Sequence, residues 1–295
     1  MRFSDSFIAV DWGTTNRRAY LLDASGRQTD EFEDGQGILS VAASGFPAAV
    51  AEIRGRLGDL PLLMAGMVGS NRGWIEAPYA PCPAGIADLV AGLVWPEAGR
   101  TAIIPGVCFS GDGRADVMRG EEVQLLGAIA SGEIPADCLV CHPGTHNKWV
   151  EVAGARIAGF TTVMTGELFS LLKEQSILSD ILRHPVVADD AFREGVAAAA
   201  HGRALTADLF SVRARVVLGE IPAAWAASLT SGLLIGADVR TGLAGRAAQE
   251  VIVMGRPELT GLYAVALESI GRTCREYDGE RAFIAGIKAI AGAMS

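Results

Sequence analysis

The sequence predicts an α/β protein that consists of two similar lobes with a cleft between them. The chain has 295 residues, and at about 150 residues per domain this length favours two domains. Half of the residues are hydrophobic and 20% are charged, so each half can bury a core. A short apolar segment followed by a polar, glycine-bearing loop occurs in both halves, at 7–16 and 138–148. A repeat at such a long spacing indicates two copies of one folding unit rather than a solenoid.

The first half alternates predicted strands with turns. Its predicted strands are 7–10, 17–22, 27–33 and 62–64. The segment Asp23-Ala24-Ser25-Gly26 has the composition of a hairpin turn, and a helix is predicted at 121–130. We place the first lobe at 1–131, with the C-terminal helix at 282–295 as a candidate to pack back onto it.

The second half repeats the order of strand, polar loop and strands, and then becomes mainly helical between 165 and 245. Its predicted strands are 138–141, 149–152, 157–163 and 251–254. Its predicted helices are 191–205, 223–239 and 259–270, and the last helix of the chain is 282–294. We place the second lobe at 132–281, after a hinge at 131–137.

Composition and charge exclude several classes of partner. The net charge is −9 and no basic stripe is concentrated in the chain, which argues against nucleic acid and an anionic membrane. No apolar run reaches the roughly 18 residues of a spanning helix, and the first residues lack the features of a signal peptide. Five scattered cysteines favour free thiols in a reducing compartment. We expect a cytoplasmic protein with a small-molecule partner, and the sequence is compatible with a homo-oligomer.

The segment Cys138-Leu139-Val140-Cys141-His142 matches the pattern of covalent haem attachment. We reject haem because no export signal precedes the segment and because residues three apart on a strand point to opposite faces. The two cysteines are better interpreted as small core residues.

The loops at 13–16 and 144–148 have the composition of phosphate-binding loops. Both contain glycine, threonine and asparagine, and a cation accompanies each, Arg17 in the first and Lys148 in the second. Glycine lets the backbone approach an anion and turn its N–H groups toward it. Neither Gly-x-x-x-x-Gly-Lys-Ser/Thr nor Gly-x-Gly-x-x-Gly occurs in the chain. The alternative is a chance similarity, since these residue types are common in turns.

Three carboxylates are candidates for chemistry. Asp11, at the end of the first strand, suits Mg²⁺ beside nucleotide phosphates; the alternative is an aspartate that forms a turn. Glu121 or Glu122 could accept the proton of an alcohol during phosphoryl transfer. The alternative for this pair is an ordinary interaction with the helix dipole.

Two other features could face a ligand. In the glycine-rich loop at 65–74, Arg72 could pair with an anionic group and Asn71 with hydroxyls, or the loop is a plain connection with Trp74 packed on the core. His146, inside the second loop, could donate to a phosphate or simply be solvated.

A series of segments in a fixed order carries a resemblance to a known family. They are Val10–Asn16 with Arg18, Met64–Asn71 with Gly73-Trp74, Val117–Glu122, Pro143–His146 with Lys148-Trp149, Val163–Leu168 and Ser231–Ala237. Over nearly the whole chain they resemble the 2-dehydro-3-deoxygalactonokinase family of the actin, Hsp70 and sugar kinase superfamily. The resemblance implies a two-lobed actin-like ATPase fold of the ribonuclease H-like type, with a duplicated domain. It also implies phosphorylation of 2-dehydro-3-deoxy-D-galactonate on its 6-hydroxyl by ATP and Mg²⁺, in galactonate catabolism.

The resemblance implies roles for individual residues. Those assigned to ATP are Gly13, Thr14, Thr15, Asn16, Gly144, Thr145, His146, Lys148, Gly236 and Gly255. The candidates for the sugar acid come from the motif segments and from the loop at 65–74 considered above; they are Arg18, Ser70, Asn71, Arg72, Trp74 and Arg119. Asp11 remains the candidate for the metal because of its place beside the first loop. Glu121 matches the superfamily's catalytic carboxylate best, and an offset of one residue leaves Glu122 open.

The chain departs from the family pattern in three places. Asn147 stands where Ser or Cys is frequent, Asp238 stands where Glu is usual, and no second glycine follows Gly255. The rival functions are a polyphosphate phosphatase of the same superfamily, and an actin-like filament protein or sugar-responsive regulator. The phosphatase predicts an extended basic channel and the regulator a DNA-binding segment, and this acidic sequence supplies neither.

Overall fold

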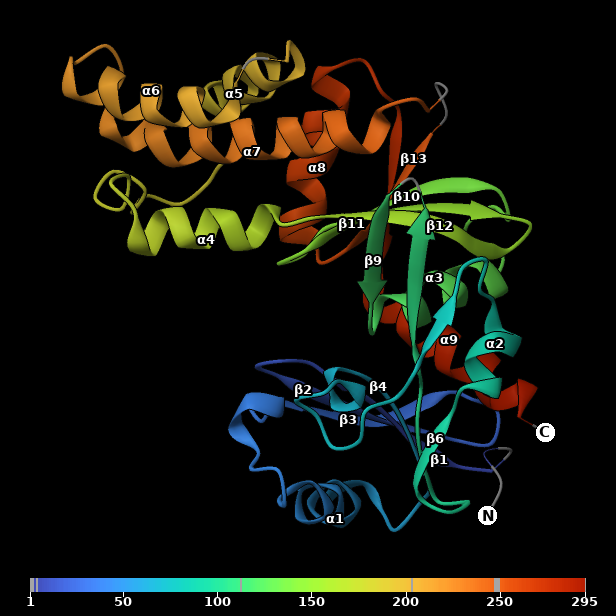
Figure 1. The fold of residues 1–295 in the computed structure, drawn as a ribbon. Coiled ribbons are helices and arrows are strands. Elements are labelled where there is room, and N and C mark those ends of the chain that lie inside the picture. The colour runs from blue at the N-terminus through green and yellow to red at the C-terminus, as the bar shows by residue number, and fades with distance from the viewer. Residues whose placement is uncertain (1–2, 4, 112, 203, 247–249, 295) are drawn as a thin grey trace. The chain divides into compact units, whose positions relative to one another are not determined.

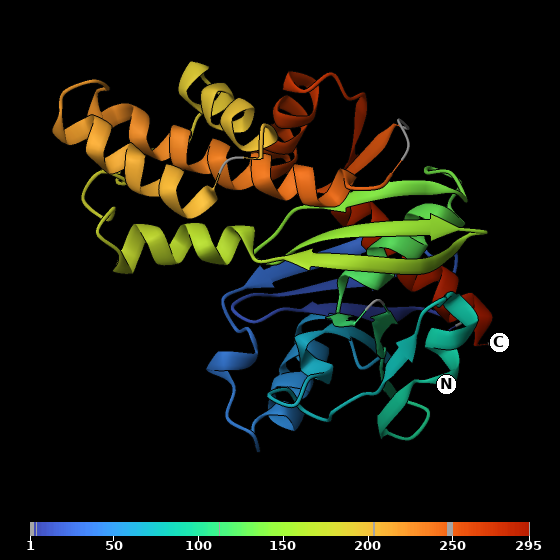
Figure 2. The same ribbon diagram turned by 45° about the horizontal axis from the view of Figure 1, so that its top comes forward.

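The computed structural model describes residues 3, 5–111, 113–202, 204–246 and 250–294. The chain divides into two compact units, which we describe separately (Figure 1 and Figure 2). Unit 1 comprises Met1–Asp137, Val152–Gly159 and Glu280–Ser295, and unit 2 comprises Cys138–Glu151 and Phe160–Gly279. Each unit contains a β-sheet with helices packed on it, which confirms the predicted α/β class. Among the described residues, no helix combines the length and the apolar character needed to cross a membrane.

The main sheet of unit 1 has six strands. They are β1 (Phe7–Trp12), β2 (Arg17–Leu22), β3 (Gln28–Asp34), β4 (Leu62–Gly66), β6 (Val94–Glu97) and β7 (Thr101–Ile103). Their order is β3-β2-β1-β4-β7-β6; β1, β2 and β3 are antiparallel neighbours, whereas β4 is parallel to β1 and to β7. A smaller sheet contains β5 (Tyr79–Pro81), β8 (Gly106–Gly111) and β9 (Arg114–Met118).

Helices cover both faces of the main sheet of unit 1 (Figure 1). They are α1 (Phe46–Leu57), α2 (Ile86–Ala91), α3 (Glu121–Ala130) and α9 (Gly279–Ala293), with short 3₁₀ helices at Ile38–Ser40 and Met67–Gly69. Successive residues of a strand point to opposite faces. Accordingly, Ala19 of β2 belongs to the core cluster that contains Phe46 of α1, whereas Tyr20 contacts Phe283 of α9 with ring centroids 5.9 Å apart.

The sheet of unit 2 has five strands. They are β10 (Cys138–His142), β11 (Asn147–Ala153), β12 (Arg156–Val163), β13 (Val251–Gly255) and β14 (Cys274–Asp278). Their order is β12-β11-β10-β13-β14, and β13 is parallel to both β10 and β14. Cys141 belongs to the core cluster of this sheet and Cys138 is buried, which confirms their interpretation as core residues.

Some helices of unit 2 pack on its sheet, and the others pack on one another in a second core cluster. They are α4 (Thr165–Gln175), α5 (Asp190–Ala200), α6 (Leu205–Val217), α7 (Ala226–Leu243) and α8 (Pro257–Ser269), with a 3₁₀ helix at Ala223–Trp225. α7 contributes Ile235 to the core cluster of the sheet and Leu233 to the cluster shared with α6. α5 and α7 approach closely at Gly195 and Gly232, where a Cβ atom on either residue would collide with the backbone of the other helix.

The two sheets share one strand order. In unit 1, β3-β2-β1 is followed by β4 and β7, and in unit 2, β12-β11-β10 is followed by β13 and β14. This correspondence confirms the predicted duplication. The strands β5 to β9 and β14 and the helices α1 and α2 were not predicted. The strands β5, β6 and β7 have three or four residues each, too few to show an alternating pattern. The proline at the start of α1 and the glycines that follow α1 and α2 are signals that the prediction did not use. The expected helices at 191–205 and 282–295 include Arg203 and Ser295, which lie outside the described residues.

Candidate active site

The first glycine–threonine loop connects β1 to β2 and is supported by backbone hydrogen bonds. The N–H of Gly13 donates to the carbonyl of Asn16 at 2.9 Å. The N–H groups of residues 37–39 donate to the carbonyls of Thr15, Gly13 and Thr14 at 3.0, 3.0 and 3.2 Å. Thr14, Thr15 and Asn16 are exposed. These bonds occupy the loop carbonyls, and the Asn16 amide donates to Glu33 Oε1 at 3.0 Å. The exposed hydroxyls of Thr14 and Thr15 are therefore the side-chain groups of this loop best placed to meet an anion.

Arg17 does not contribute to this loop, so the expectation that it adds charge there is wrong. Its side chain is fully buried. Nη2 lies 2.7 Å from Asp34 Oδ2 and 3.5 Å from Glu52 Oε2, and the guanidinium lies 5.3 Å from the centre of the Trp12 ring. In β2 the alternation of side chains turns Arg17 toward α1 and leaves Arg18 on the opposite face.

Asp11 lies at the end of β1, opposite Arg18 in the antiparallel register. A Cβ atom at Gly66 would come within 3.3 Å of Asp11 Oδ1, and one at Gly120 would come within 3.3 Å of the Gly66 Cα. Both glycines have a positive φ, +89° and +110°, which other residues rarely adopt. The end of β4 and the start of α3 therefore approach Asp11 through glycine backbone.

The two glutamates that begin α3 lie in different surroundings. Glu121 is partly exposed, and its Oε2 accepts the N–H of Arg119 at 3.1 Å. Glu122 is fully buried; its Oε2 accepts the N–H of Gly120 at 2.7 Å, and its Oε1 has no hydrogen-bond partner in the described part of the chain. Burial, and then the neighbouring Glu121, raise the pKa of Glu122 to about 8. Of these two glutamates, Glu121 is the one with an accessible side chain.

Arg119 precedes α3 and is only 9% exposed. Its Nη2 donates to the carbonyl of Ala77 at 2.8 Å, and its guanidinium lies 4.2 Å from the centre of the Tyr79 ring. A Cβ atom at Gly69 would come within 2.9 Å of Nη1, so glycine at this position makes room for the guanidinium. Nε and Nη1 have no hydrogen-bond partner among the residues described. Arg119 thus links the start of α3 to the segment after β4.

The loop after β4 combines exposed and packed residues. Asn71 and Arg72 are exposed. Ser70 is buried, and its hydroxyl closes the preceding 3₁₀ turn through a 2.7 Å bond to the carbonyl of Met67. Trp74 stacks on Phe46 with ring centroids 6.4 Å apart and planes inclined by 6°. Trp74 therefore packs on the core of unit 1, as the alternative interpretation of this loop required.

The second glycine–threonine loop, between β10 and β11, repeats the exposure pattern of the first. Gly144 is partly buried, whereas Thr145 and His146 are exposed. His146 Nε2 lies 2.6 Å from Glu167 Oε2. Lys148 is 5% exposed and its Nζ donates to the carbonyl of His146 at 3.0 Å. A Cβ atom at Gly144 would meet no protein atom closer than 3.9 Å, so protein packing leaves space at this glycine.

Helix α4 begins directly against this loop. A Cβ atom at Gly166 would lie 2.5 Å from the carbonyl oxygen of Gly144, and the N–H of Glu167 donates to the carbonyl of Thr145 at 2.9 Å. The first N–H groups of a helix and the helix dipole stabilise negative charge. The loop and the start of α4 therefore offer two adjacent sources of anion stabilisation in unit 2.

Asp238 of α7 is 1% exposed and accepts hydrogen bonds from four side chains. The donors are Asn147 Nδ2 (2.9 Å to each oxygen), Trp149 Nε1 (2.6 Å), Thr165 Oγ1 (2.5 Å) and the Tyr263 hydroxyl (2.5 Å). Burial raises the pKa of Asp238, and the four donors act in the opposite direction. The carboxylate connects the start of β11, the start of α4 and α8. Asn147 and Asp238, two departures from the family pattern, are direct partners.

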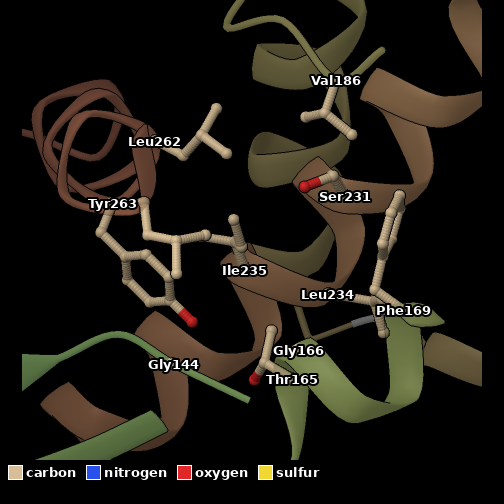
Figure 3. A pocket seen from close by; sticks show the side chains of 11 residues that line it. Gly144, Thr165, Gly166, Phe169, Val186, Ser231, Leu234, Ile235, Leu262 and Tyr263 are labelled. Carbon is tan, nitrogen blue, oxygen red and sulfur yellow. The ribbon is translucent and has the colours of Figure 1, made fainter. Parts of the chain in front are cut away.

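An apolar pocket of about 180 Å³ lies next to Gly144 in unit 2. Figure 3 shows side chains from α4, α7 and α8 around it. The residues that line it are Gly144, Thr165, Gly166, Phe169, Val186, Ser231, Leu234, Ile235, Leu259, Leu262 and Tyr263. The pocket thus adjoins both the second loop and the start of α4.

Of the two late glycines assigned to ATP, Gly255 lies closer to the loop. It has φ +157° at the end of β13, and a Cβ atom there would come within 3.5 Å of the Pro143 carbonyl oxygen. Gly236 faces α5, where a Cβ atom would come within 2.9 Å of Val196. The adjacent residue, Ile235, lines the pocket. The role of both glycines in ATP binding stays a prediction.

Sequence reasoning missed the pocket and the contacts of Asp238. Phe169, Leu262 and Tyr263 are apolar or aromatic residues of amphipathic helices, and such residues usually form core. One signal was available: Asp238 is a single carboxylate within the otherwise uncharged stretch 226–239 of α7. A lone carboxylate in an apolar helix requires buried partners.

Three comparisons with known proteins agree. The family described as 2-keto-3-deoxy-galactonokinase matches residues 11–290. A protein of Rhizobium meliloti named "Probable 2-dehydro-3-deoxygalactonokinase" is 37% identical over 305 residues, which cover 98% of this chain and 97% of the relative. The 2-dehydro-3-deoxygalactonokinase of Escherichia coli is also 37% identical, over 298 residues and 98% of both chains.

Solved structures support the fold. A crystal structure of a candidate 2-dehydro-3-deoxygalactonokinase from Sinorhizobium meliloti matches with a TM-score of 0.91 at 36% identity, covering 98% of this chain and 99% of that one. The activator of 2-hydroxyisocaproyl-CoA dehydratase from Clostridium difficile matches with a TM-score of 0.50 at 11% identity, covering 98% and 95%. The second likeness concerns the fold alone. Together with the duplicated sheets, these matches confirm the expected actin-like ATPase architecture.

Proposed function

This chain belongs to the 2-keto-3-deoxy-galactonokinase family, and from that premise we propose that it phosphorylates 2-dehydro-3-deoxy-D-galactonate with ATP. The acceptor in this proposal is the 6-hydroxyl, and the products are ADP and the 6-phosphate of the sugar acid. The observation that carries the nucleotide part is the arrangement in unit 2, where a glycine loop, a helix start and an apolar pocket are adjacent.

The nucleotide fits this arrangement with its base in the pocket and its phosphates toward Gly144. Pockets that hold a whole drug-sized ligand measure about 300–1,000 Å³, so 180 Å³ suits the base alone. The phosphates would occupy the space beside Gly144, where the positive end of the α4 dipole would stabilise them; the Glu167 N–H itself is bonded to the Thr145 carbonyl. Thr145 adds a hydroxyl and Lys148 a positive charge to the same loop.

Asp11 is the residue that we propose for Mg²⁺. The described residues contain no cluster of three or more His, Cys, Asp or Glu side chains that would suit a metal ion. Mg²⁺ is usually bound by one or two carboxylates together with phosphate oxygens and water, so one partly exposed carboxylate fits it. When bound, the ion would neutralise charge on the phosphates.

Glu121 is the residue that we propose as the proton acceptor. The carboxylate removes the proton of the 6-hydroxyl as that oxygen forms a bond to the γ-phosphorus, and the bond from phosphorus to the ADP oxygen breaks. Glu122 is unsuited to this role because its side chain is fully buried and one of its oxygens is bonded to the Gly120 N–H. Its raised pKa also keeps it largely protonated at neutral pH.

The sugar acid is assigned to the segments around Asp11 in unit 1. Arg72 is exposed in the loop after β4 and is a suitable partner for the carboxylate of the substrate. Arg18 is 23% exposed and pairs with Glu33 at 3.1 Å, so a ligand would compete with that pair. The other proposed contacts are Ser70, Asn71 and Arg119.

A coupled assay of ADP release tests this function. At saturating MgATP, the rate with 2-dehydro-3-deoxygalactonate should greatly exceed the rate without it, and ³¹P NMR should find the phosphate on the 6-oxygen. Equal rates with and without the sugar acid would exclude the kinase and favour the rival functions. The gluconate epimer, run in parallel, measures how strongly the site discriminates at one carbon.

The remaining expectations stay predictions. They are a cytoplasmic location and no nucleic-acid or membrane partner; the sequence is also compatible with a homo-oligomer. Sedimentation of the purified protein with and without ATP measures the assembly state and would also reveal a filament.

A further inference from the structure

The pocket beside Gly144 has polar groups in its wall, but most of them are already engaged. Thr165 Oγ1 and the Tyr263 hydroxyl each lie 2.5 Å from Asp238 Oδ2 and donate to it. A hydroxyl has one proton to donate. Because Asp238 takes both protons, neither hydroxyl is available as a donor to a ligand in the pocket.

Asp238 itself is also unavailable to a ligand. Its two oxygens receive five hydrogen bonds from four side chains, and the residue is only 1% exposed. An ionised carboxylate offers about four lone-pair sites, so its accepting capacity is filled. Asp238 is therefore fully engaged by Asn147, Trp149 and the two lining hydroxyls, and it is not itself one of the residues that line the pocket.

The rest of the lining offers little to the edge of a base. Phe169, Leu234, Ile235 and Leu262 are apolar, and all lie in helices whose backbone groups bond within the helix. Among the described lining residues, Ser231 is the one further hydroxyl (Figure 3). The lining can contact the faces of a ring by packing, while the hydrogen-bonding edge of the ring meets few partners.

We infer that this kinase holds the base of its phosphoryl donor by apolar contact and forms no specific hydrogen bonds to the edge of the base, so that GTP can serve as the donor in place of ATP. The inference rests on the proposed function. Adenine and guanine share the purine ring system and differ in the donors and acceptors along one edge. A site that hydrogen-bonds such groups rejects the wrong ligand by about 10⁴–10⁵-fold, whereas an apolar pocket discriminates by only about 10–200-fold.

The test compares kcat/KM for ATP and GTP with saturating 2-dehydro-3-deoxygalactonate and Mg²⁺. The expected ratio of ATP to GTP is below about 200, the upper limit for apolar discrimination. A larger ratio would overturn the inference. It would indicate that backbone groups near Val186, a lining residue between α4 and α5, form hydrogen bonds to the base. No ADP release with ATP at all would instead refute the proposed function, so the two failures are distinguishable.

A pair of serine variants sharpens the test. Ser231→Ala removes the remaining hydroxyl of the lining, and Ser228→Ala is its matched control on the same helix, where the hydroxyl accepts the Val187 N–H at 3.1 Å. Both variants should leave the ratio of ATP to GTP close to that of the unmodified protein. A tenfold change in that ratio for Ser231→Ala alone, which corresponds to about one hydrogen bond, would overturn the inference.

Discussion

The two glycine–threonine loops occupy equivalent places in their sheets, but the chain holds them in different ways. The loop after β1 is supported by backbone N–H groups of residues 37–39. The loop after β10 receives one such backbone bond, from the Glu167 N–H to the Thr145 carbonyl, and is further supported by side chains. Asn147 donates to Asp238, and Lys148 donates to the loop carbonyl of His146. The two cations also differ. Arg17 is buried and pairs with Asp34, whereas the Lys148 Nζ donates to the loop carbonyl of His146.

The surroundings of the loops also differ. Asp11 and the start of α3 both lie close to Gly66 at the end of β4 in unit 1. The loop of unit 2 adjoins an apolar pocket and the start of α4. A repeated sequence pattern therefore predicts a repeated backbone, while the chemistry of each copy depends on the elements that pack around it. We propose that unit 1 supplies the proton acceptor, the Mg²⁺ ligand and one phosphate loop, and that unit 2 supplies the pocket for the base and the second phosphate loop.

The largest expected effect is on Glu121 in unit 1. Glu121→Gln keeps the size of the side chain but removes its ability to accept a proton. It should lower kcat by roughly 10²–10⁴-fold, the usual contribution of a general base. MgATP affinity, measured by calorimetry, should stay nearly unchanged, because Glu121 is proposed to act on the acceptor hydroxyl and not on the nucleotide.

Glu122→Gln is the matched control for that experiment. Its buried side chain should matter for stability and little for turnover. If Glu122→Gln is inactive and Glu121→Gln turns over normally, the assignment is off by one residue. If both turn over normally, the proton acceptor lies elsewhere.

The two loop cations should separate activity from stability. Lys148→Met should lower kcat/KM by roughly 10²–10³-fold, as expected for loss of a preorganised charge. Arg17→Met should instead lower the free energy of unfolding by roughly 3 kcal/mol, the lower end for a broken buried ion pair, because Asp34 keeps 19% exposure. Urea unfolding and steady-state kinetics on both variants measure the contrast. Normal kinetics for a folded Lys148→Met protein would give Lys148 a structural role like that of Arg17.

Asp238→Asn tests whether side-chain support of the second loop matters for the nucleotide. The amide has nearly the same shape, but its NH₂ group cannot accept the protons of Thr165 or Tyr263. Displacement of the loop and the pocket wall should raise the KM for ATP by roughly tenfold to a hundredfold, with a smaller effect on the KM for the sugar acid. Ser228→Ala serves again as the control. Equal increases in both KM values would indicate general destabilisation instead.

The smallest expected effect concerns the pH dependence of stability. Burial raises the pKa of Glu122 from 4.5 to about 8, so the folded state retains a proton that the unfolded state releases. The corresponding stability is fully present below about pH 4.5 and is lost as the pH rises through about 8. Glu122→Gln should therefore raise Tm by a few °C at pH 9 and change it little at pH 4.5. A parallel pH profile for both proteins would contradict the burial of this carboxyl.

Much of the fold could be predicted from local sequence. The apolar segments that became β1, β2, β10 and β13 are bounded by polar loops or glycine, so their type and position were readable. The prediction for β3 was also close, because a turn at Asp23–Gly26 precedes it; Asp23 accepts N–H groups from Ser25 and Arg27. The strands β5 and β7 have three residues each, too few for an alternating pattern to be recognised.

The candidate site was less predictable, since each assignment depends on burial. The helix period showed that Glu121 and Glu122 point in different directions, but not which one faces the interior. The sequence allowed Trp74 to be either a ligand contact or a core residue, and its stacking on Phe46 shows that it packs on the core. Phe169 and Tyr263 lie far apart in the chain, and nothing local links them to one pocket.

The sequence by itself determined the duplicated α/β architecture and the two loops, because strands, turns and glycine conformations follow from interactions between residues close in the chain. The tertiary structure decided which side chains carry chemistry. The burial of Arg17 and the four donors around Asp238 depend on contacts between distant segments: Arg17 and Asp34 are 17 residues apart, and Asn147 and Asp238 are 91 residues apart. The burial of Glu122 and the apolar pocket likewise depend on the packing of distant segments. Charge state and accessibility are set by those distant neighbours, and so they cannot be read from a local pattern.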